Sequence, residues 1–364
     1  LANRHEIDAC LQHHRDGWAA DKARESLQGL LILRIKLEAE MIELGFWKNL
    51  KWPIFCLAPI ADVTDCAFRE YIAKYSDTER SFGRVFWTEF VSADGLAHPK
   101  AREKLLIDLK YTEAERPIVA QIFGSNPDNI REAAKLAKEL GFDGVDINMG
   151  CPDRSIEKQG AGAGMIKNPK LAREVIRAAK EGAGGLPVSV KTRIGYNKNE
   201  MEEWLPELLA EDIAALTVHL RTRKEMSLVP AHWELMQRVI EIRNETGKET
   251  LIIGNGDVLD LADAQNKINE YGCDGVMLGR AIFGNPWLFT SPLTPLLNKE
   301  RGIHEKLGVM VEHTKLFEKL LGEHKNFAIM KKHYKAYVNN FEGAKELRMK
   351  LMEANDAREV ETIT

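Results

Sequence analysis

The stretch GVDINMGCP at positions 144–152 decides the fold, because a short apolar strand ends there in a polar turn that carries a cysteine. Pro152 has no N–H with which to extend a strand ladder, and Gly150 tolerates unusual backbone angles. The chain is therefore expected to leave a sheet at this turn, with Asn148 and Cys151 pointing into the space above the strand end. A cysteine at that edge is placed for chemistry.

Similar strands recur on both sides of this one and alternate with helical patterns. Two of the helices have clear start signals. Asn126-Pro127 forms an N-cap and first-turn pair before a helix predicted at 128–140, and Asn168-Pro169 does the same before 170–181. Eight apolar strand candidates begin near Ile54, Arg84, Pro117, Gly144, Val188, Ala215, Leu251 and Gly275.

The strands are apolar along nearly their whole length. Such strands are covered on both faces, which favours parallel strands with helices outside them. Eight βα units over about 230 residues predict an α/β fold of the closed (β/α)8 type, the TIM barrel. A doubly wound open sheet is the alternative, but it would need a GxGxxG turn after the first strand, where this sequence has Ala58-Pro59-Ile60-Ala61.

Three domains are predicted from the same pattern. The barrel is expected to span residues 46–297 as the catalytic domain. Beyond Pro295 the pattern is continuously helical as far as Thr364, which predicts a separate helical domain at 298–364. Residues 1–45 are expected to form an N-terminal extension of one or two amphipathic helices, in which we identify no chemistry.

The charge of the chain is unevenly distributed. The 364 residues carry a net charge of −4, which gives no sign of a nucleic-acid binder as a whole, but residues 300–350 contain 11 Lys and Arg against 7 Asp and Glu. The cluster of Lys331, Lys332, His333 and Lys335 lies in this segment. A basic segment on an acidic body indicates a local contact with a polyanion, although a solvated helix face is an equally valid interpretation.

The five cysteines are an odd number without a CxxC pair, so neither a disulfide framework nor a zinc site is indicated, and no metal is expected. This usage fits a reducing, cytoplasmic setting. No apolar stretch approaches the roughly 18 to 20 residues of a membrane span, and the chain does not open on a signal-peptide pattern. We therefore expect a soluble, monomeric protein with no membrane partner.

Most of the residues at the ends of the predicted strands are polar. In a (β/α)8 barrel the loops after the strands form the active-site face, so these residues should share one rim. Any one of them could be an ordinary loop residue, but the set together predicts an active site. In strand order they are Pro59; Glu89; Gln121; Asn148 and Cys151; Lys191 and Arg193; His219 and Arg221; Asn255, Gly256 and Asp257; Gly279 and Arg280.

The last two strand ends, 254–257 and 279–281, have the composition of a phosphate pocket, because glycines let backbone N–H groups approach an anion and an arginine adds a bidentate donor. Lys191 would face the barrel axis beside a cofactor held there. A fixed cation in that position suits a cofactor that becomes anionic in use, such as a reduced flavin. The alternative is that Lys191 forms a structural ion pair with a carboxylate such as Glu89.

Cys151 differs from cysteines on apolar strands because it sits in a polar turn. With an ordinary pKa of about 8.5 it is mostly a protonated thiol at neutral pH. It could donate a proton or, beside a base, attack as a thiolate.

Eight motifs appear together in one order, and the ordered set resembles the flavin-dependent tRNA-dihydrouridine synthase family. The similarity covers roughly residues 54–290, and 332–337 resembles the family's C-terminal helical domain. Each motif is weak alone, whereas their order is specific. The motifs are LAPIADVTD (57–65), TEFVS (88–92), QIFG (121–124), DINMGCP (146–152), VKTR (190–193), HLRT (219–222), GNGD (254–257) and LGRA (278–281).

The resemblance implies a reductase of uridine in tRNA, in which NADPH reduces FMN, a hydride passes to C6 of the uracil and Cys151 protonates C5. A uracil stacked in folded RNA must be flipped out to reach such a site. The resemblance implies substrate contacts from Asn148, Arg193 and Arg221, with Lys331 and Lys332 contacting the RNA. It implies FMN contacts from Pro59, Ile60, Ala61, Gln121, Lys191, His219, Asn255, Gly256, Asp257, Gly279 and Arg280.

Three positions depart from the pattern of that family. Ile60 replaces a usual methionine, Leu220 replaces a usual glycine, and Val229-Pro230-Ala231-His232 stands where Gly-Pro-Ala-Asp is expected. Leu220 puts the shape of its loop in doubt. Two other functions remain open at this point: a flavin-dependent reductase of free pyrimidine or another small enone, and a non-catalytic RNA-binding barrel.

Overall fold

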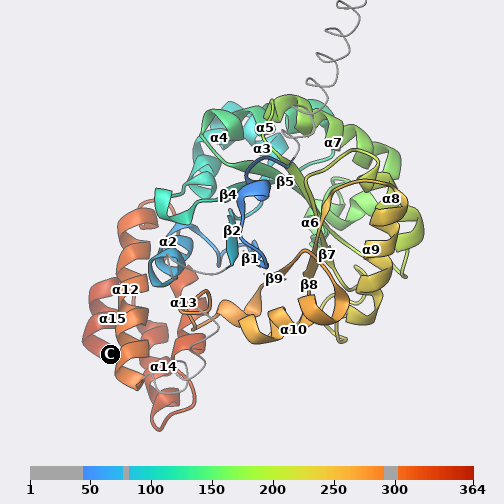
Figure 1. Cartoon of the computed structure of the whole chain (residues 1–364). Coiled ribbons are helices and arrows are strands. Elements are labelled where there is room, and N and C mark those ends of the chain that lie inside the picture. Colours follow the sequence, from blue (N-terminus) through green and yellow to red (C-terminus); the bar gives the residue numbers. More distant parts are fainter. Residues whose placement is uncertain (1–43, 77–81, 291–301) are drawn as a thin grey trace, which may run out of the picture. The chain divides into compact units, whose positions relative to one another are not determined.

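A closed barrel of eight parallel strands forms the centre of the computed structural model, which describes residues 44–76, 82–290 and 302–364 (Figure 1). Strand β1 pairs with both β2 and β9, and β2 also pairs with β4, so the sheet has no open edge. This confirms the predicted (β/α)8 barrel and rules out the open sheet. The barrel strands are β1 (Ile54–Leu57), β2 (Gly83–Trp87), β4 (Ile118–Phe123), β5 (Gly144–Met149), β6 (Val188–Arg193), β7 (Ala215–His219), β8 (Leu251–Asn255) and β9 (Gly275–Leu278).

One short strand, β3 (Val91–Ser92), was not predicted. β2 and then β3 pair with β4, and the segment that joins them has one residue more than β4 has opposite it. Trp87 pairs with Val119, and Val91 pairs with Ile122. Four steps along one strand therefore oppose three along the other, which defines a β-bulge. The bulge lies at 88–90 and redirects the end of the second barrel strand.

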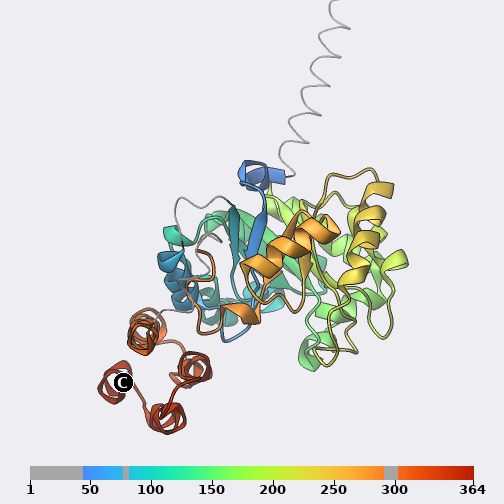
Figure 2. The same cartoon turned by 60° about the horizontal axis from the view of Figure 1, so that its bottom comes forward.

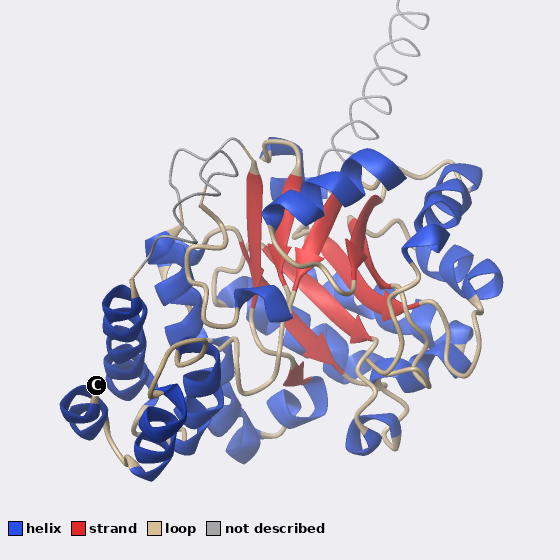
Figure 3. Ribbon diagram, turned by 90° about the horizontal axis from the view of Figure 1, so that it is seen from below, coloured by secondary structure: helices blue, strands red, loops and turns tan. Residues whose placement is uncertain are grey.

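Helices surround the barrel as the alternating pattern predicts (Figures 1 and 3). Asn126 caps one of them by accepting hydrogen bonds from the backbone N–H groups of Asp128 and Asn129, and Asn168 caps another by accepting from Leu171. Both predicted helix starts are confirmed. The main outer helices are α2 (Cys66–Tyr75), α5 (Pro127–Glu139), α7 (Pro169–Ala183), α8 (Met201–Leu209), α9 (Met236–Glu245) and α10 (Leu261–Tyr271).

Shorter helices lie between these elements. They are η1 (Gly45–Asn49), α3 (Ala93–Ala97), α4 (Pro99–Leu105), η2 (Leu106–Leu109), η3 (Glu113–Glu115), α6 (Arg154–Glu157), η4 (Gly162–Lys167), η5 (Trp233–Leu235) and η6 (Arg280–Ile282).

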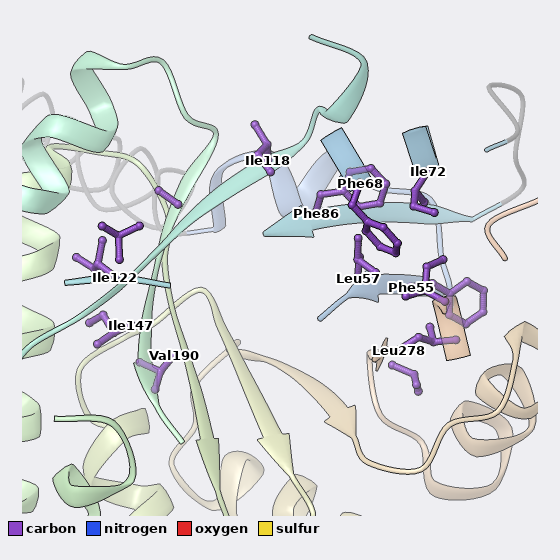
Figure 4. Close-up of a cluster of buried hydrophobic side chains, with 14 of the residues drawn as sticks. Phe55, Leu57, Phe68, Ile72, Phe86, Ile118, Ile122, Ile147, Val190 and Leu278 are labelled. Carbon is purple, nitrogen blue, oxygen red and sulfur yellow. The ribbon is translucent and has the colours of Figure 1, made fainter. Parts of the chain in front are cut away.

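The side chains of each strand divide between two environments. Those that face outward, such as Phe55, Ile147 and Val190, pack against the helices (Figure 4). The alternate, inward-facing positions are apolar near the strand starts, where Trp47, Cys56 and other residues fill the barrel floor. Because side chains alternate with a period of two, the polar inward positions gather near the strand ends, which places a functional site there.

The C-terminal residues 302–364 contain four helices and no strand. The helices are α12 (Ile303–Leu321), α13 (Ala328–Tyr337), α14 (Ala344–Glu353) and α15 (Ala357–Ile363). The predicted helical character of this segment is confirmed. The helical pattern is not continuous as expected, because turns separate the four helices. Figure 2 shows them grouped beside the barrel, with α12 packed against α2.

The predicted domain boundary at 297/298 and nearly all of the extension at 1–45 lie outside the described residues, so both stay predictions. In the part of the chain that is described, no helix is both long and apolar enough to cross a membrane.

Candidate functional site

A pocket of about 710 Å³ opens at the carboxyl ends of the barrel strands. Four cationic side chains line it against one carboxylate, that of Asp257, so the pocket favours an anionic ligand. Eleven of the predicted site residues line it: Pro59, Ile60, Lys191, Arg193, His219, Arg221, Asn255, Gly256, Asp257, Gly279 and Arg280. The other six are outside its lining: Ala61, Gln121, Asn148, Cys151, Lys331 and Lys332.

Lys191 brings a partly buried positive charge into the pocket with no carboxylate of the described residues within ion-pair distance; the buried Asp146 acts on it through a longer-range charge interaction. Its ammonium donates to Asn255 Oδ1 at 3.2 Å, and the Asn255 amide is oriented by donating its Nδ2 to the Met277 carbonyl at 2.8 Å. Among the described residues Lys191 has no ion-pair partner. Burial, followed by the neighbouring Arg193, lowers its pKa to about 8. An ammonium in this state is stabilised by any anion that enters.

Glu89, the carboxylate named as an example of a structural partner for Lys191, does not pair with it. Glu89 instead pairs with Lys325 at 2.6 Å.

His219 is neutral at physiological pH, because burial and then the surrounding cations hold its pKa well below the usual value. Arg221 Nη1 lies 3.2 Å from His219 Nε2. Since a guanidinium can only donate, Nε2 accepts and the ring proton is on Nδ1. His219 therefore offers the pocket a neutral N–H donor.

Asp257 joins the two arginines that close this side of the pocket. Its Oδ1 lies 2.6 Å from Arg280, and its Oδ2 pairs with Arg221 and accepts from the Ala231 N–H. Its carboxylate therefore contacts protein cations and leaves anion binding to backbone N–H groups and to Arg280. Gly256 has a φ of +128°, and a Cβ there would lie 2.7 Å from the Ala231 Cβ, so only glycine fits this turn.

Arg193 holds two loops together. Its Nε donates to the Gly150 carbonyl at 2.7 Å, and its Nη1 donates to Thr222 and Met226 carbonyls, both at 3.2 Å. Arg221 similarly donates its Nε to Val229. Four of the six hydrogen bonds of these two predicted substrate-binding arginines therefore go to loop carbonyls, three of them from Arg193.

Leu220, the departure that put this loop in doubt, is accommodated. Its side chain is fully buried in the core, and its φ is not in the left-handed region. Its N–H donates to the Asn255 carbonyl, and its carbonyl accepts from His232. A residue with a side chain fits here because the backbone needs no glycine conformation.

A chain of side-chain amides supports the Cys151 turn. Gln121 donates its Nε2 to Asp146 Oδ2 at 2.6 Å and accepts at Oε1 from Asn148 Nδ2 at 3.1 Å. Asn148 Oδ1 then accepts from the Gly150 and Cys151 N–H groups. The Asp146 carboxylate thus orients the Gln121 amide, and Gln121 in turn orients the Asn148 amide. Asn148 then holds the turn that carries Cys151.

Asp146 was missed as a site residue by the sequence analysis. It is fully buried, and burial raises its pKa to about 6 despite hydrogen bonds from Ser189 and Gln121. It lies two residues before Asn148 on β5, so the two side chains share the inward face of that strand. The period of two along that strand was the signal that could have found it.

Cys151 is half-buried just beyond the pocket wall, where its neighbour Pro152 contributes to the lining. Its side chain packs among Phe90, Phe123, Ile156 and Ala161. Burial raises its pKa, and the opposing effects of Arg193 and Lys191 do not reverse this. The sulfur is therefore a protonated thiol at neutral pH, close enough to Lys191 for each to influence the pKa of the other.

A family model described as dihydrouridine synthase matches residues 56–364. The chain belongs to the dihydrouridine synthase family. This confirms the resemblance drawn from the motifs and, with it, the predicted class of enzyme, an oxidoreductase.

Two relatives match nearly the whole family region. A "Probable tRNA-dihydrouridine synthase" of Staphylococcus epidermidis is 41% identical over 317 residues, which cover 86% of this chain and 94% of that protein. A "Probable tRNA-dihydrouridine synthase 2" of Bacillus subtilis is 41% identical over 321 residues, covering 88% and 95%. Among solved structures, an old yellow enzyme homologue from Zymomonas mobilis aligns with a TM-score of 0.47 at 15% identity, covering 68% of this chain and 89% of its own.

In this member of the dihydrouridine synthase family, the C-terminal helices contact the loop that follows β1. Lys325 pairs with Glu89 and with Asp108 at 2.7 Å, and the other oxygen of Glu89 accepts from the Asp62 N–H at 2.5 Å. Lys332 pairs with the Asp62 side chain at 2.9 Å. The loop that carries Pro59, Ile60 and Ala61 is therefore tied to the helices from two sides.

The basic cluster predicted at 331–335 is divided by the structure. Lys332 lies toward the barrel, whereas Lys331 donates to the Met352 carbonyl of α14. His333 is buried against Phe68, and burial lowers its pKa to about 4. Its inclusion in a basic surface was wrong, because it is a neutral core residue. Within the described residues, no three His, Cys, Asp or Glu side chains are grouped so as to hold a metal ion.

Proposed function

We propose that this protein reduces the C5=C6 bond of uridines in tRNA, with FMN bound in the barrel pocket and NADPH as the source of electrons. The family and the printed names of its relatives support the reaction and the substrate. One observation carries the assignment of the site: Lys191 is a partly buried cation that pairs directly with no carboxylate among the described residues, on the strand beside the one that precedes the Cys151 turn.

The residues of the pocket fit a flavin mononucleotide. A volume of about 710 Å³ is in the range of cofactor sites. The phosphate group would be held by the backbone at 256–257 and 279–280 together with Arg280, and the ring by Lys191 and the β1 loop. Gln121 is fully buried outside the lining, so its predicted role would be indirect, through Asn148 and the Cys151 turn. When bound, the flavin supplies the hydride that the uracil takes up at C6.

Cys151 would supply the proton. Hydride addition at C6 builds negative charge at C5 and O4, so the step needs an acid at C5. The raised pKa of the Cys151 thiol keeps that proton in place at neutral pH. Asn148 holds the backbone of the turn, and Arg193 holds the Gly150 carbonyl, so the sulfur is presented from a fixed position.

The helical domain at 298–364 would contact the RNA. A uridine must leave its stack to enter a pocket at the end of a barrel, so the rest of the tRNA has to be held outside. Lys331 and Lys332 on α13 are the residues we assign to this contact, and affinity should fall with salt as phosphate contacts require. His333 takes no part in it.

The test is mass spectrometry of an unmodified tRNA transcript incubated with protein, FMN and NADPH. A gain of two hydrogens on a uridine is the expected result. The Cys151→Ala variant should retain bound flavin but lose product, because the site keeps its shape and loses its acid; wild-type turnover by this variant would remove Cys151 from its role. Equal activity on free uridine would favour a small-pyrimidine reductase, and protein that binds tRNA but takes up no FMN would favour a non-catalytic barrel.

A further inference from the structure

Three exposed apolar residues, Met226, Leu228 and Leu259, belong to loops that line the pocket. We refer to them as the apolar rim. Leu228 is 84% exposed and Leu259 75%, and no other large hydrophobic side chain in the described residues is as exposed as these two. Single exposed apolar residues are ordinary on protein surfaces. It is their position around one pocket that distinguishes this group.

The apolar rim belongs to two loops that follow neighbouring barrel strands. Met226 and Leu259 contribute directly to the lining of the pocket, and Leu228 follows Ser227, which also lines it. β7 and β8, from which the two loops come, are paired along their length. Side chains from the two loops therefore stand over the same opening.

The backbone under the apolar rim is fixed. The Met226 carbonyl accepts from Arg193 Nη1 at 3.2 Å, the Leu228 N–H donates to the Glu225 carbonyl, and the Leu259 N–H donates to Asp263. Met226 has a φ of +57°, an unfavourable conformation for a residue with a side chain, which the surrounding contacts must hold. These side chains are thus presented to solvent from a rigid support.

The charge of the pocket indicates what passes over the apolar rim. Four cations against one carboxylate select a ligand rich in phosphate, and Arg280 is largely exposed at the opening. When a base is flipped out of a nucleic acid, its two neighbours lose a stacking partner, and proteins fill such gaps with apolar side chains. We propose that the apolar rim packs against the bases that flank the flipped uridine in RNA, an inference that rests on the proposed function and specifies how its substrate is held.

The test compares the double variant Leu228→Ser/Leu259→Ser with Leu140→Ser. Leu140 is also an exposed leucine, but it follows α5 at the end of the barrel where the strands begin. If the flanking bases lose their apolar contact, the KM for tRNA should rise roughly tenfold in the double variant, as expected when the burial of about one apolar side chain is lost. In the single variant Leu228→Ser, whose residue does not line the pocket, the KM for tRNA should also rise, while bound flavin and the rate at which NADPH reduces it without tRNA should stay at the wild-type values. Leu140→Ser should resemble the wild type throughout.

An unchanged KM for tRNA in the double variant would overturn the assignment of the rim, as would an equal rise in Leu140→Ser. Slower flavin reduction by NADPH, with the KM for tRNA unchanged, would mean that the rim serves the reductant. A wild-type protein that forms no dihydrouridine would overturn both this inference and the proposed function, whereas wild-type activity with unaffected rim variants would overturn the inference alone.

Discussion

Two lysines of this molecule, Lys191 in the pocket and Lys325 beside the barrel, have opposite electrostatic surroundings. Lys325 lies between Glu89 and Asp108; burial alone would lower its pKa, but the two carboxylates outweigh burial and raise it. Lys191 has one amide oxygen as its direct partner, and burial lowers its pKa to about 8 although the charge of Asp146 acts in the opposite direction. A cation that is paired directly with carboxylates of the chain serves the structure, whereas a cation without such a direct partner is available to a ligand.

The comparison predicts first that Lys325 is a stability residue. Lys325→Met leaves two carboxylates without their cation, and breaking a buried pair in this way costs about 3–5 kcal/mol in the free energy of unfolding. Urea denaturation measures the loss. Lys335→Met is the matched control, since Lys335 is exposed on α13 and its ammonium has no recorded partner in the described residues. Equal stability of the two variants would show that the Lys325 site is not a buried pair.

Lys191→Met should lose activity rather than stability, the opposite of what we expect for Lys325→Met. The charge it removes has no direct ion-pair partner among the described residues and is costly to bury, but it favours the buried Asp146 carboxylate, so the free energy of unfolding should change much less than in Lys325→Met. Activity should fall by about 10²–10³-fold, the usual loss when one group that stabilises transition-state charge is removed, and flavin affinity should fall with it. Steady-state kinetics and the absorbance of bound flavin measure these effects. A variant that loses stability and keeps its activity would reverse the assignment of the two lysines.

Acid should loosen the same contact between barrel and helices that Lys325 anchors. His333 stacks on Phe68 of α2 with its pKa lowered to about 4, and the neighbouring His313 has a pKa far below the usual value, in both cases because of burial. The unfolded chain therefore binds more protons than the folded protein between pH 6.5 and 4, so stability is lost as pH falls through this range. For His333 alone the loss is on the order of 3 kcal/mol.

Thermal unfolding as a function of pH checks this, with His333→Phe as the comparison. Phenylalanine keeps a ring against Phe68 and removes the proton site. The loss of stability between pH 6.5 and 4 should therefore be smaller in this variant than in the wild type. Identical pH profiles would mean that His333 does not stay neutral in the folded protein.

The strand end that carries Lys191 was predictable from sequence, whereas the contacts of Lys325 between the barrel and the C-terminal helices were not. Strand starts and the caps at Asn126 and Asn168 are local signals, readable within a few residues. The Lys325–Glu89 pair joins positions 236 residues apart, and no local pattern indicates such a contact. The same limit explains why Lys191 was given Glu89 as a possible partner.

His333 shows a second limit of reading neighbours along the chain. It follows two lysines in sequence, but successive residues of a helix are rotated by about 100°, so adjacent positions face different surroundings. Counting the helix face would have separated His333 from Lys332. The bulge at 88–90 had no comparable signal, because one extra residue in a strand leaves the apolar pattern almost unchanged.

The smallest expected effect concerns Lys332. Like Lys325 it pairs with a carboxylate of the chain, and like Lys191 it is proposed to contact a ligand. Its pair with Asp62 is exposed, at 52% for the lysine and 57% for the aspartate, and pairs of this kind contribute about 0–1 kcal/mol. Lys332→Met should therefore leave the free energy of unfolding nearly unchanged. If its ammonium exchanges Asp62 for a phosphate when RNA binds, the variant should bind tRNA more weakly, and the slope of log affinity against log salt should decrease by about 1. Fluorescence anisotropy with labelled tRNA at several salt concentrations measures the slope. An unchanged slope, with the stability also unchanged, would make Lys332 a surface residue without a role in either the structure or the complex.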